Sequence, residues 1–142
     1  MRYHFKIHRE GKKYWAQGVE LDGCFTQADS IEDLAANMEE ALNLFLDEPA
    51  DSSAVFSDSR PLLKGRNIIS VPVEPKIAFA MQVRQSRLRR KLTQHEAATK
   101  LGMKNLYSYQ RLESSKTANP ELTTLMRIKK AFPEFSADLV LG

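Results

Sequence analysis

Hydrophobic and polar positions alternate at the start of the chain. Tyr3, Phe5 and Ile7 are separated by polar residues, which is the period of a strand with one buried side. The stretch EGKK then predicts a hairpin turn, and KYWAQGV predicts a second strand that returns antiparallel to the first. After LDGC, the short stretch FTQA predicts a third strand. The first 28 residues therefore predict a small antiparallel sheet.

The period changes to that of a helix after Ser30. Ser30 and Asp33 form a variant of the capping box, which predicts the start of a helix. The apolar residues that follow are spaced to form one stripe facing the sheet, and they are Ile31, Leu34, Ala35, Met38, Ala41, Leu42, Phe45 and Leu46. Residues 49–65 are rich in Ser, Pro, Asp and Gly and predict a long loop. Residues 67–73 predict a short strand, and Pro72 indicates either an edge position or the end of the strand.

Helical periods fill the rest of the chain. The stretch KIAFAMQVRQSRLRRK predicts a helix with one inward face, formed by Ile77, Ala80, Met81, Arg84 and Leu88. Thr93 and Glu96 form a capping box that predicts the next helix, and Gly102 ends it. A third helix is expected over residues 105–112.

Two further helices are expected near the end of the chain. Asn119 is the expected cap of the fourth helix, with Pro120 in its first turn, and Ser136 caps a short fifth one. The sequence therefore predicts an α+β protein of two domains. Residues 1–73 form a small antiparallel sheet with one helix, and residues 74–142 form an all-α domain of four to five helices.

The second and third helices of the all-α domain have the pattern of a helix-turn-helix. Such a pair needs a small side chain where the helices approach and a residue that tolerates positive φ in the turn. Ala98 and Gly102 meet these needs, and Tyr109 and Leu112 can anchor the second helix of the pair. Long, polar or cationic residues remain outside, where they can reach base edges and phosphates. The expected DNA-binding residues are Thr93, Gln94, Lys104, Asn105, Tyr107, Ser108, Gln110 and Arg111. The alternative is a polar helix face that is only solvated.

Charge is distributed unevenly along the chain. Residues 1–73 carry 8 Lys or Arg and 12 Asp or Glu, whereas residues 74–142 carry 13 and 6. The stretch RQSRLRRK at 84–91 alone holds five cations, although several of these can equally be the solvated face of a helix. The first part therefore suits a cationic partner, and the second part suits a polyanion such as DNA.

Composition excludes several classes of protein. With 42% hydrophobic and 27% charged residues, the chain is neither disordered nor fibrous. Its one cysteine, Cys24, cannot form an internal disulfide, and no apolar segment approaches the roughly 20 residues that span a bilayer. The first residues lack the pattern of a signal peptide, so we expect a cytoplasmic protein.

Catalytic chemistry is not indicated by the sequence. His4, His8 and His95 have no Ser or Cys partner at a suitable spacing. A two-metal site needs inward-pointing carboxylates from different elements, whereas Glu39 and Glu40 are adjacent on one helix. We therefore expect no enzyme activity, no metal site and no cofactor.

The all-α domain resembles a known family of DNA-binding domains. The stretch RQSRLRRKLTQHEAATKLGMKNLYSYQRLE, followed by NPELTTLMRIKKAF, is similar to the Cro/C1-type helix-turn-helix of phage repressors. The LTQ start, the positions of Ala98 and Gly102 and the RLE ending match that family. One residue more than usual lies between Gly102 and Glu113, which affects the register of the base-contacting residues.

The first domain resembles the sheet-forming domain of HicB antitoxins. The hairpin and the stretch LDGCFTQADSIEDLAANMEEALNLFLDE carry this similarity. The resemblance implies a partial ribonuclease-H-like fold that binds and occludes a small basic RNA-cleaving toxin, HicA. It also implies that the second domain dimerises, binds operator DNA and represses the operon of both proteins.

Charge independently favours an acidic surface for such a toxin, because a protein that cleaves RNA must be cationic to hold its substrate. The candidate toxin-binding residues are Glu32, Asp33, Glu39, Glu40, Asp47 and Glu48, and each can equally be an ordinary solvated residue. The alternative function is a stand-alone helix-turn-helix regulator whose first domain senses a ligand, and a nuclease ranks last. A short basic protein encoded next to this chain would favour the antitoxin.

Overall fold

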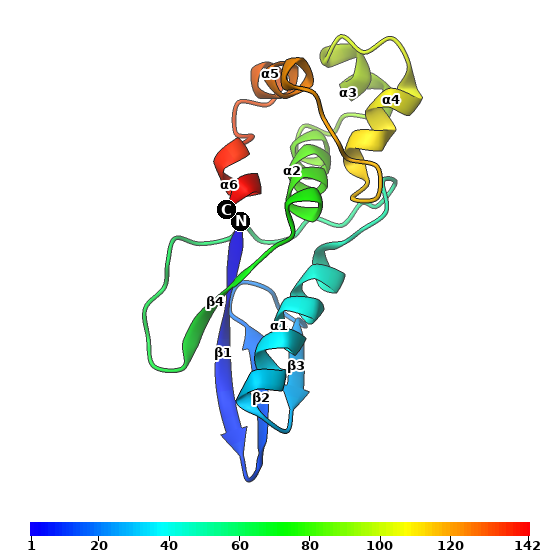
Figure 1. The fold of residues 1–142 in the computed structure, drawn as a ribbon. Helices are drawn as coiled ribbons and strands as arrows, with labels where there is room; N and C mark the ends of the chain where they lie inside the picture. The colour runs from blue at the N-terminus through cyan, green and yellow to red at the C-terminus, as the bar shows by residue number, and fades with distance from the viewer. The chain divides into compact units, whose positions relative to one another are not determined.

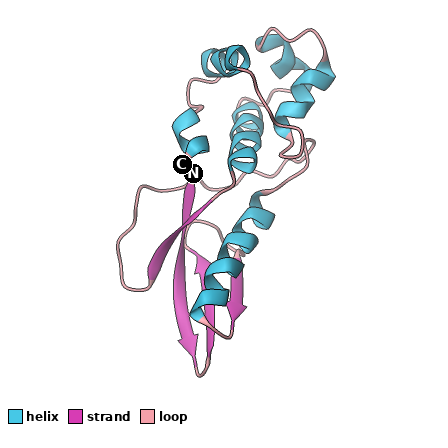
Figure 2. Cartoon of the chain, viewed as in Figure 1, coloured by secondary structure: helices cyan, strands magenta, loops and turns pink.

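A computed structural model describes all 142 residues and shows a mixed α+β protein, with a four-stranded antiparallel sheet and six α-helices (Figures 1 and 2). The chain divides into two compact units, described here separately. The first contains residues 1–46 and 56–73 with Gly142, and the second contains residues 47–55 and 74–141. The elements are β1 (Arg2–Glu10), β2 (Lys13–Gly18), β3 (Phe25–Ala28), α1 (Ile31–Leu46), β4 (Ile68–Pro72), α2 (Pro75–Arg89), α3 (Gln94–Lys100), α4 (Leu106–Gln110), the 3-10 turn η1 (Arg111–Glu113), α5 (Leu122–Ala131) and α6 (Ala137–Leu141).

The sheet has the strand order β3-β2-β1-β4, and all of its neighbours are antiparallel. The first two strands form a hairpin in which Glu10 pairs with Lys13, and Gly11 takes a φ of 62° in the turn. This confirms the four strands that the sequence predicts. β4 lies at an edge, as Pro72 at its end requires.

Helix α1 covers one face of the sheet. Its buried apolar row consists of residues four apart, namely Leu34, Met38, Leu42 and Leu46. The stripe is narrower than the sequence predicts, because Ala35 is exposed and Ile31, the first residue of the helix, is 48% exposed. The backbone N–H of Asp33 donates to the hydroxyl of Ser30 over 3.1 Å, which confirms the predicted cap.

The segment between α1 and β4 contains no helix or strand, as predicted, but part of it is fixed to the first unit by hydrogen bonds. The buried carboxylate of Glu20 accepts from the N–H of Arg60 over 3.1 Å and lies 3.0 Å from Nδ1 of His4. Nε2 of His4 accepts from the N–H of Leu63 over 3.1 Å. The pair His4–Glu20 therefore holds residues 60–63 against β1.

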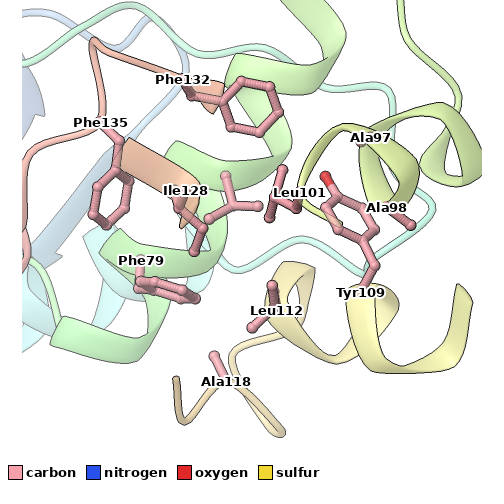
Figure 3. Packing of buried hydrophobic residues seen from close by; sticks show 11 residues of the cluster. Phe79, Ala97, Ala98, Leu101, Tyr109, Leu112, Ala118, Ile128, Phe132 and Phe135 are labelled. Atoms are coloured by element: carbon pink, nitrogen blue, oxygen red, sulfur yellow. The ribbon is translucent and has the colours of Figure 1, made fainter. Parts of the chain in front are cut away.

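The second unit is built around α2, which has buried residues on all of its sides rather than on the single predicted face. Phe79 and Val83 of α2 lie in one apolar cluster with residues of α3, α4 and α5 (Figure 3). The rings of Phe79 and Phe135 meet edge to face, with centroids 5.7 Å apart. A helix enclosed in this way places its polar residues in the interior too, and these need partners.

The ends of the last two helices test two predicted caps. α5 begins at Leu122 with Glu121 at its cap position, so the predicted start at Asn119 and Pro120 is wrong. Residues 119–121 instead remain outside the helix, and Pro120 therefore occupies a position where no N–H is required. The hydroxyl of Ser136 accepts from the N–H of Leu139 over 3.2 Å, which confirms the cap of α6.

The carboxylate of Glu20 predicts how the stability of the first unit depends on pH. Burial acts to raise its pKa, but hydrogen bonds from His4 and from the N–H of Arg60 lower it below the usual 4.5. A lowered pKa means that this carboxylate stabilises the fold above about pH 4.5 and loses its contribution as the pH falls through the folded-state pKa. Glu20→Gln should therefore lower the free energy of unfolding by about 1–3 kcal/mol at neutral pH, because it leaves buried donors unsatisfied.

Urea unfolding of the full chain at neutral pH and below pH 4 measures this effect. The difference between wild type and Glu20→Gln should shrink at the lower pH. Glu10→Gln, which changes an exposed carboxylate on β1, is the matched control and should change little at either pH. A difference that grows on acidification would contradict the assigned role of Glu20.

Candidate functional site

Helix α3 begins with the capping box that the sequence predicts. The hydroxyl of Thr93 accepts from the N–H of Glu96 over 3.1 Å, and the carboxylate of Glu96 accepts from the N–H of Thr93 over 3.0 Å. These two bonds satisfy donors that the first turn of a helix otherwise leaves free. The bond that the backbone N–H of Thr93 donates also lowers the pKa of the Glu96 carboxylate. Because its hydroxyl fixes α3, Thr93 is held in one place at the surface.

A tight turn joins α3 to α4. Gly102 takes a φ of 70°, and the N–H of Met103 donates to the carbonyl of Ala98 over 2.9 Å, which closes the end of α3 in a Schellman arrangement. The side-chain oxygen of Asn105 then caps α4 by accepting from the N–H of Ser108 over 2.8 Å. The turn is thus fixed at both of its ends.

The inner sides of α3 and α4 meet in the core. Ala97, Ala98, Leu101 and Tyr109 are at most 3% exposed, and the ring of Tyr109 lies beside Ala98 and Leu101 (Figure 3). Small side chains at positions 97 and 98 let a large aromatic ring approach α3 closely. The two helices are therefore held by packing as well as by their turn, and their outer sides keep a fixed relation to each other.

A buried ion pair joins these helices to α2. The carboxylate of Glu113, which is fully buried, accepts from Nε and Nη2 of Arg87 over 2.6 and 2.9 Å. It also accepts from the hydroxyl of Tyr109, and Nε2 of Gln94 lies 3.3 Å away. The main-chain carbonyl of Glu113 accepts from Nη1 of Arg84 over 3.1 Å. One residue of η1 thus joins α2, α3 and α4 through hydrogen bonds, and we call these five residues the Glu113 network.

The electrostatics of the Glu113 network are strongly coupled. Hydrogen bonds to Glu113 raise the pKa of Arg87, so this guanidinium is charged at all ordinary pH values. Burial, with the adjacent charge of Glu113, raises the pKa of the Tyr109 hydroxyl, which therefore remains a donor. Burial lowers the pKa of Arg84, and its Nε has no hydrogen-bond partner. Arg87 and Tyr109 therefore both remain protonated and continue to donate hydrogen bonds to the carboxylate of Glu113.

Two predicted DNA-binding residues use their side chains inside the unit. Nε2 of Gln94 donates to the carbonyl of Ala50 over 2.9 Å, and its Oε1 accepts from Nε2 of Gln110 over 3.0 Å. Both glutamines are half-buried. In this structure Gln94 and Gln110 therefore fix α4 relative to α3.

Five of the predicted DNA-binding residues are exposed on α4, on the turn before it and at the start of η1. They are Lys104, Asn105, Tyr107, Ser108 and Arg111. Tyr107 is 63% exposed, and the guanidinium of Arg111 lies 5.9 Å from the centre of its ring. We call this surface the α4 face. It presents two cations, an aromatic ring and short hydrogen-bonding groups, with no carboxylate among the five.

The cations of RQSRLRRK do not form one basic surface. Arg84 and Arg87 are buried in the Glu113 network, and Arg90 forms an ion pair with Glu134. Nη2 of Arg90 donates to this carboxylate over 2.8 Å, which lowers the pKa of Glu134 to about 2. Arg84 lies on the inward face, as predicted, and Arg87 is buried as well, whereas Arg89 and Lys91 are exposed, so the solvated face that the sequence allowed holds for part of the stretch.

The first unit carries an acidic surface on α1. Glu32 and Glu39 are seven residues apart, as are Asp33 and Glu40, so each pair is separated by about two helical turns. All four side chains are exposed. We call these four residues the acidic α1 face. No Lys or Arg interrupts α1.

The other two predicted toxin-binding residues lie outside α1. Asp47 and Glu48 follow the last turn of the helix and belong to the second unit. The carboxylate of Asp47 accepts from the hydroxyl of Ser115 over 2.6 Å, and the carbonyl of Glu48 lies 3.4 Å from Nη1 of Arg84. Both residues therefore contribute to the surroundings of α2 and η1 rather than to the acidic α1 face.

Residues that could support other chemistry are engaged elsewhere. No group of three or more His, Cys, Asp or Glu is arranged to hold a metal ion. His8 stacks on Trp15, and His4 pairs with Glu20. Burial raises the pKa of the Cys24 thiol to about 11, which keeps it protonated at neutral pH. No helix is long and apolar enough to cross a membrane.

Removing one partner of the buried ion pair should strongly destabilise the protein. Arg87→Met leaves the carboxylate of Glu113 buried without its guanidinium, at a cost of about 3–5 kcal/mol in the free energy of unfolding. The double variant Arg87→Met with Glu113→Leu should recover much of this loss, because no isolated charge remains buried. Urea unfolding of the full-length variants measures both values.

Arg90→Met provides a matched control for this experiment. It removes a cation from the same helix region, but its ion pair with Glu134 is partly exposed, so the change should stay within about 1 kcal/mol. Equal losses in Arg87→Met and Arg90→Met would show that the Glu113 network does not hold the unit together.

The chain was compared with known families and proteins. No family model matches it, and no curated protein matches it significantly.

Proposed function

We propose that the second unit binds duplex DNA through the α4 face, as the second helix of a helix-turn-helix of the Cro/C1 type. The observation that carries this proposal is the α4 face itself, which presents Lys104, Arg111 and short polar side chains. Its opposite side is fixed by the Glu113 network. A helix that is already held rigid and presents cations and hydrogen-bonding groups can enter the major groove with little loss of conformational entropy.

The proposed roles divide the α4 face into two groups. Lys104 and Arg111 contact phosphates, which supply affinity without sequence preference. The proposed contacts to base edges come from the side chains of Asn105, Tyr107 and Ser108. Of these, Oδ1 of Asn105 also caps α4. Gln94 acts by positioning α4, since its amide bonds to Gln110 and Ala50.

We further propose that the first unit binds a cationic protein through the acidic α1 face. The four exposed carboxylates of α1 attract a basic partner and compete with RNA phosphates for it. Together with the resemblance to HicB antitoxins, this supports a non-catalytic antitoxin. It would occlude a small RNA-cleaving toxin and repress the operon that encodes both proteins.

Repression through a symmetric operator requires two DNA-binding units, so the proposed active form is a dimer. Exposed apolar residues on α5 support pairing between copies. Leu122 and Met126, one turn apart, are 80% and 72% exposed. Their burial against a second copy would remove apolar surface from water.

Removing the two cations of the α4 face should weaken DNA binding. Lys104→Ala with Arg111→Ala should reduce affinity for the promoter of the protein's own gene and make the dependence of log K on log salt shallower by about two, one for each lost phosphate contact. A mobility-shift titration at several salt concentrations measures both effects, and the protein–DNA stoichiometry should be two chains for each operator.

Lys12→Ala with Lys64→Ala removes the same net charge from the first unit and serves as the control. Both lysines are exposed, so folding should not change. An equal loss of affinity in both double variants would assign binding to net charge rather than to the α4 face. A single chain on each operator would contradict the proposed dimer.

Reversing charge on the acidic α1 face should slow association with the toxin. Glu39→Lys with Glu40→Lys should lower the association rate constant for the small basic protein encoded next to this chain, most strongly at low salt, because steering is screened by ions. Stopped-flow or surface binding kinetics at two salt concentrations measure the effect.

Asp51→Lys with Glu121→Lys reverses the same charge at exposed positions outside α1 and is the control. Its association rate constant should exceed that of the α1 variant. Identical rates for both variants would remove the acidic α1 face from the proposal, while leaving the proposed DNA binding untouched.

A further inference from the structure

The sheet has a second face, on the side away from α1. Strand register places Lys6 opposite Gln17, His8 opposite Trp15, and Gln17 opposite Phe25. Because neighbouring residues of a strand point to opposite faces, these side chains share the face opposite to the buried Phe5 and Ala16. Residues 60–63 cover the part of this face at His4, and the part formed by β2, β3 and residues 6–8 of β1 remains open. We call this part the open face.

Aromatic rings stand on three neighbouring strands of the open face. The rings of His8 and Trp15 stack with centroids 4.0 Å apart and an angle of 16° between their planes. Phe25 on β3 is 69% exposed, although nothing in its own strand requires an aromatic residue there. Phe25 and the stacked Trp15 both line one hollow, so their apolar ring surface is gathered at one place on the sheet.

A hollow of about 720 Å³ lies over these strands. Trp15 and Phe25 line it together with the amides of Gln17 and Gln27, and the loop before β3 forms one of its walls. Both glutamines are exposed, and each amide carries donors and an acceptor, although Nε2 of Gln17 already lies 3.3 Å from Nε2 of His8. The hollow thus combines ring surfaces with groups that can bond to the edge of a planar ligand.

The charges of the unit separate across the sheet. The acidic α1 face lies on the helix side, whereas the strands of the open face carry Lys6 and Lys13. Glu10 stands opposite Lys13 in the strand register, and both residues line the hollow together with Asp22. Lys13 is therefore the cation that lines the hollow, and two carboxylates line it as well, so the hollow offers a phosphate little net positive charge. A ligand of this face must gain most of its affinity from stacking and only a small part from charge.

We infer that the open face binds unpaired nucleotides of single-stranded RNA, with bases stacked on Phe25 and beside Trp15. Bases are flat, aromatic and rich in edge donors and acceptors, which matches the rings and the two glutamine amides. The choice of RNA rather than DNA rests on the proposed function, in which the partner toxin cleaves RNA. The open face would then hold an RNA segment on the opposite side of the sheet from the acidic α1 face.

The protein contains its own reporter for this test. Trp15 is the only tryptophan of the chain, so its fluorescence reports on the open face alone. Titration of the full-length protein with a short single-stranded RNA of mixed sequence should quench this fluorescence and reach saturation. The salt dependence should be shallow, with a slope of log K against log salt near −0.7, as expected for one phosphate contact.

Variants of Phe25 separate stacking from simple apolar contact. Phe25→Ala and Phe25→Leu should each weaken RNA binding by about 5-fold to 100-fold, the measured range for one stacked base, whereas Phe25→Tyr should bind nearly as the wild type does. Because Phe25 is exposed, all three variants should unfold in urea as the wild type does. Phe25→Ala should also keep its affinity for duplex DNA, since α3 and α4 are unchanged.

Three results would overturn the inference. They are an absence of saturable quenching, full binding by Phe25→Leu, and a change in Trp15 fluorescence that follows protein concentration without RNA, which would show a second copy covering the open face. Lys104→Ala with Arg111→Ala separates this inference from the proposed function. That variant should lose DNA binding, and RNA should still quench its Trp15 fluorescence. A failure of the proposed DNA binding therefore leaves the inferred RNA binding testable, and the reverse also holds.

Discussion

The second unit depends on one buried carboxylate. Glu113 carries a full negative charge in the interior, and a charge in that position is tolerable only when donors surround it. Arg87 supplies two donors and Tyr109 a third, so α2, α4 and η1 must keep one arrangement to satisfy it. This requirement fixes the inner side of α4 and, through it, the direction in which the α4 face points.

The first unit follows a different rule, because a helix covers only one side of its sheet and residues 60–63 cover only part of the other. Strand alternation sends Phe5 and Ala16 toward α1 and leaves His8, Trp15 and Gln17 on the other side. One short sheet therefore has a helix side that is acidic and a strand side that carries rings and amides. The acidic α1 face and the open face share no residue, so a cationic ligand on one and an aromatic ligand on the other would not compete for the same side chains.

Local patterns were enough to predict most of the elements. The alternation around Phe5, the capping box of Thr93 and the positive φ of Gly102 depend on neighbours in the sequence, and the structure confirms all three. The Glu113 network depends on residues 26 positions apart, so the sequence showed Arg87 only as one more cation of a basic stretch. The four-residue spacing between Tyr109 of α4 and Glu113 of η1 is the local signal of this network.

Residues 47–55 lie between two parts of the first unit in the chain but pack with the second. The carbonyl of Ala50 in this segment serves as an acceptor for Gln94, which in turn orients Gln110. The two units are therefore interleaved along the polypeptide rather than joined end to end. Recombination at a single junction near Val73 would separate the second unit from residues 47–55, which pack with it, so transfer of the whole unit between genes requires two crossovers.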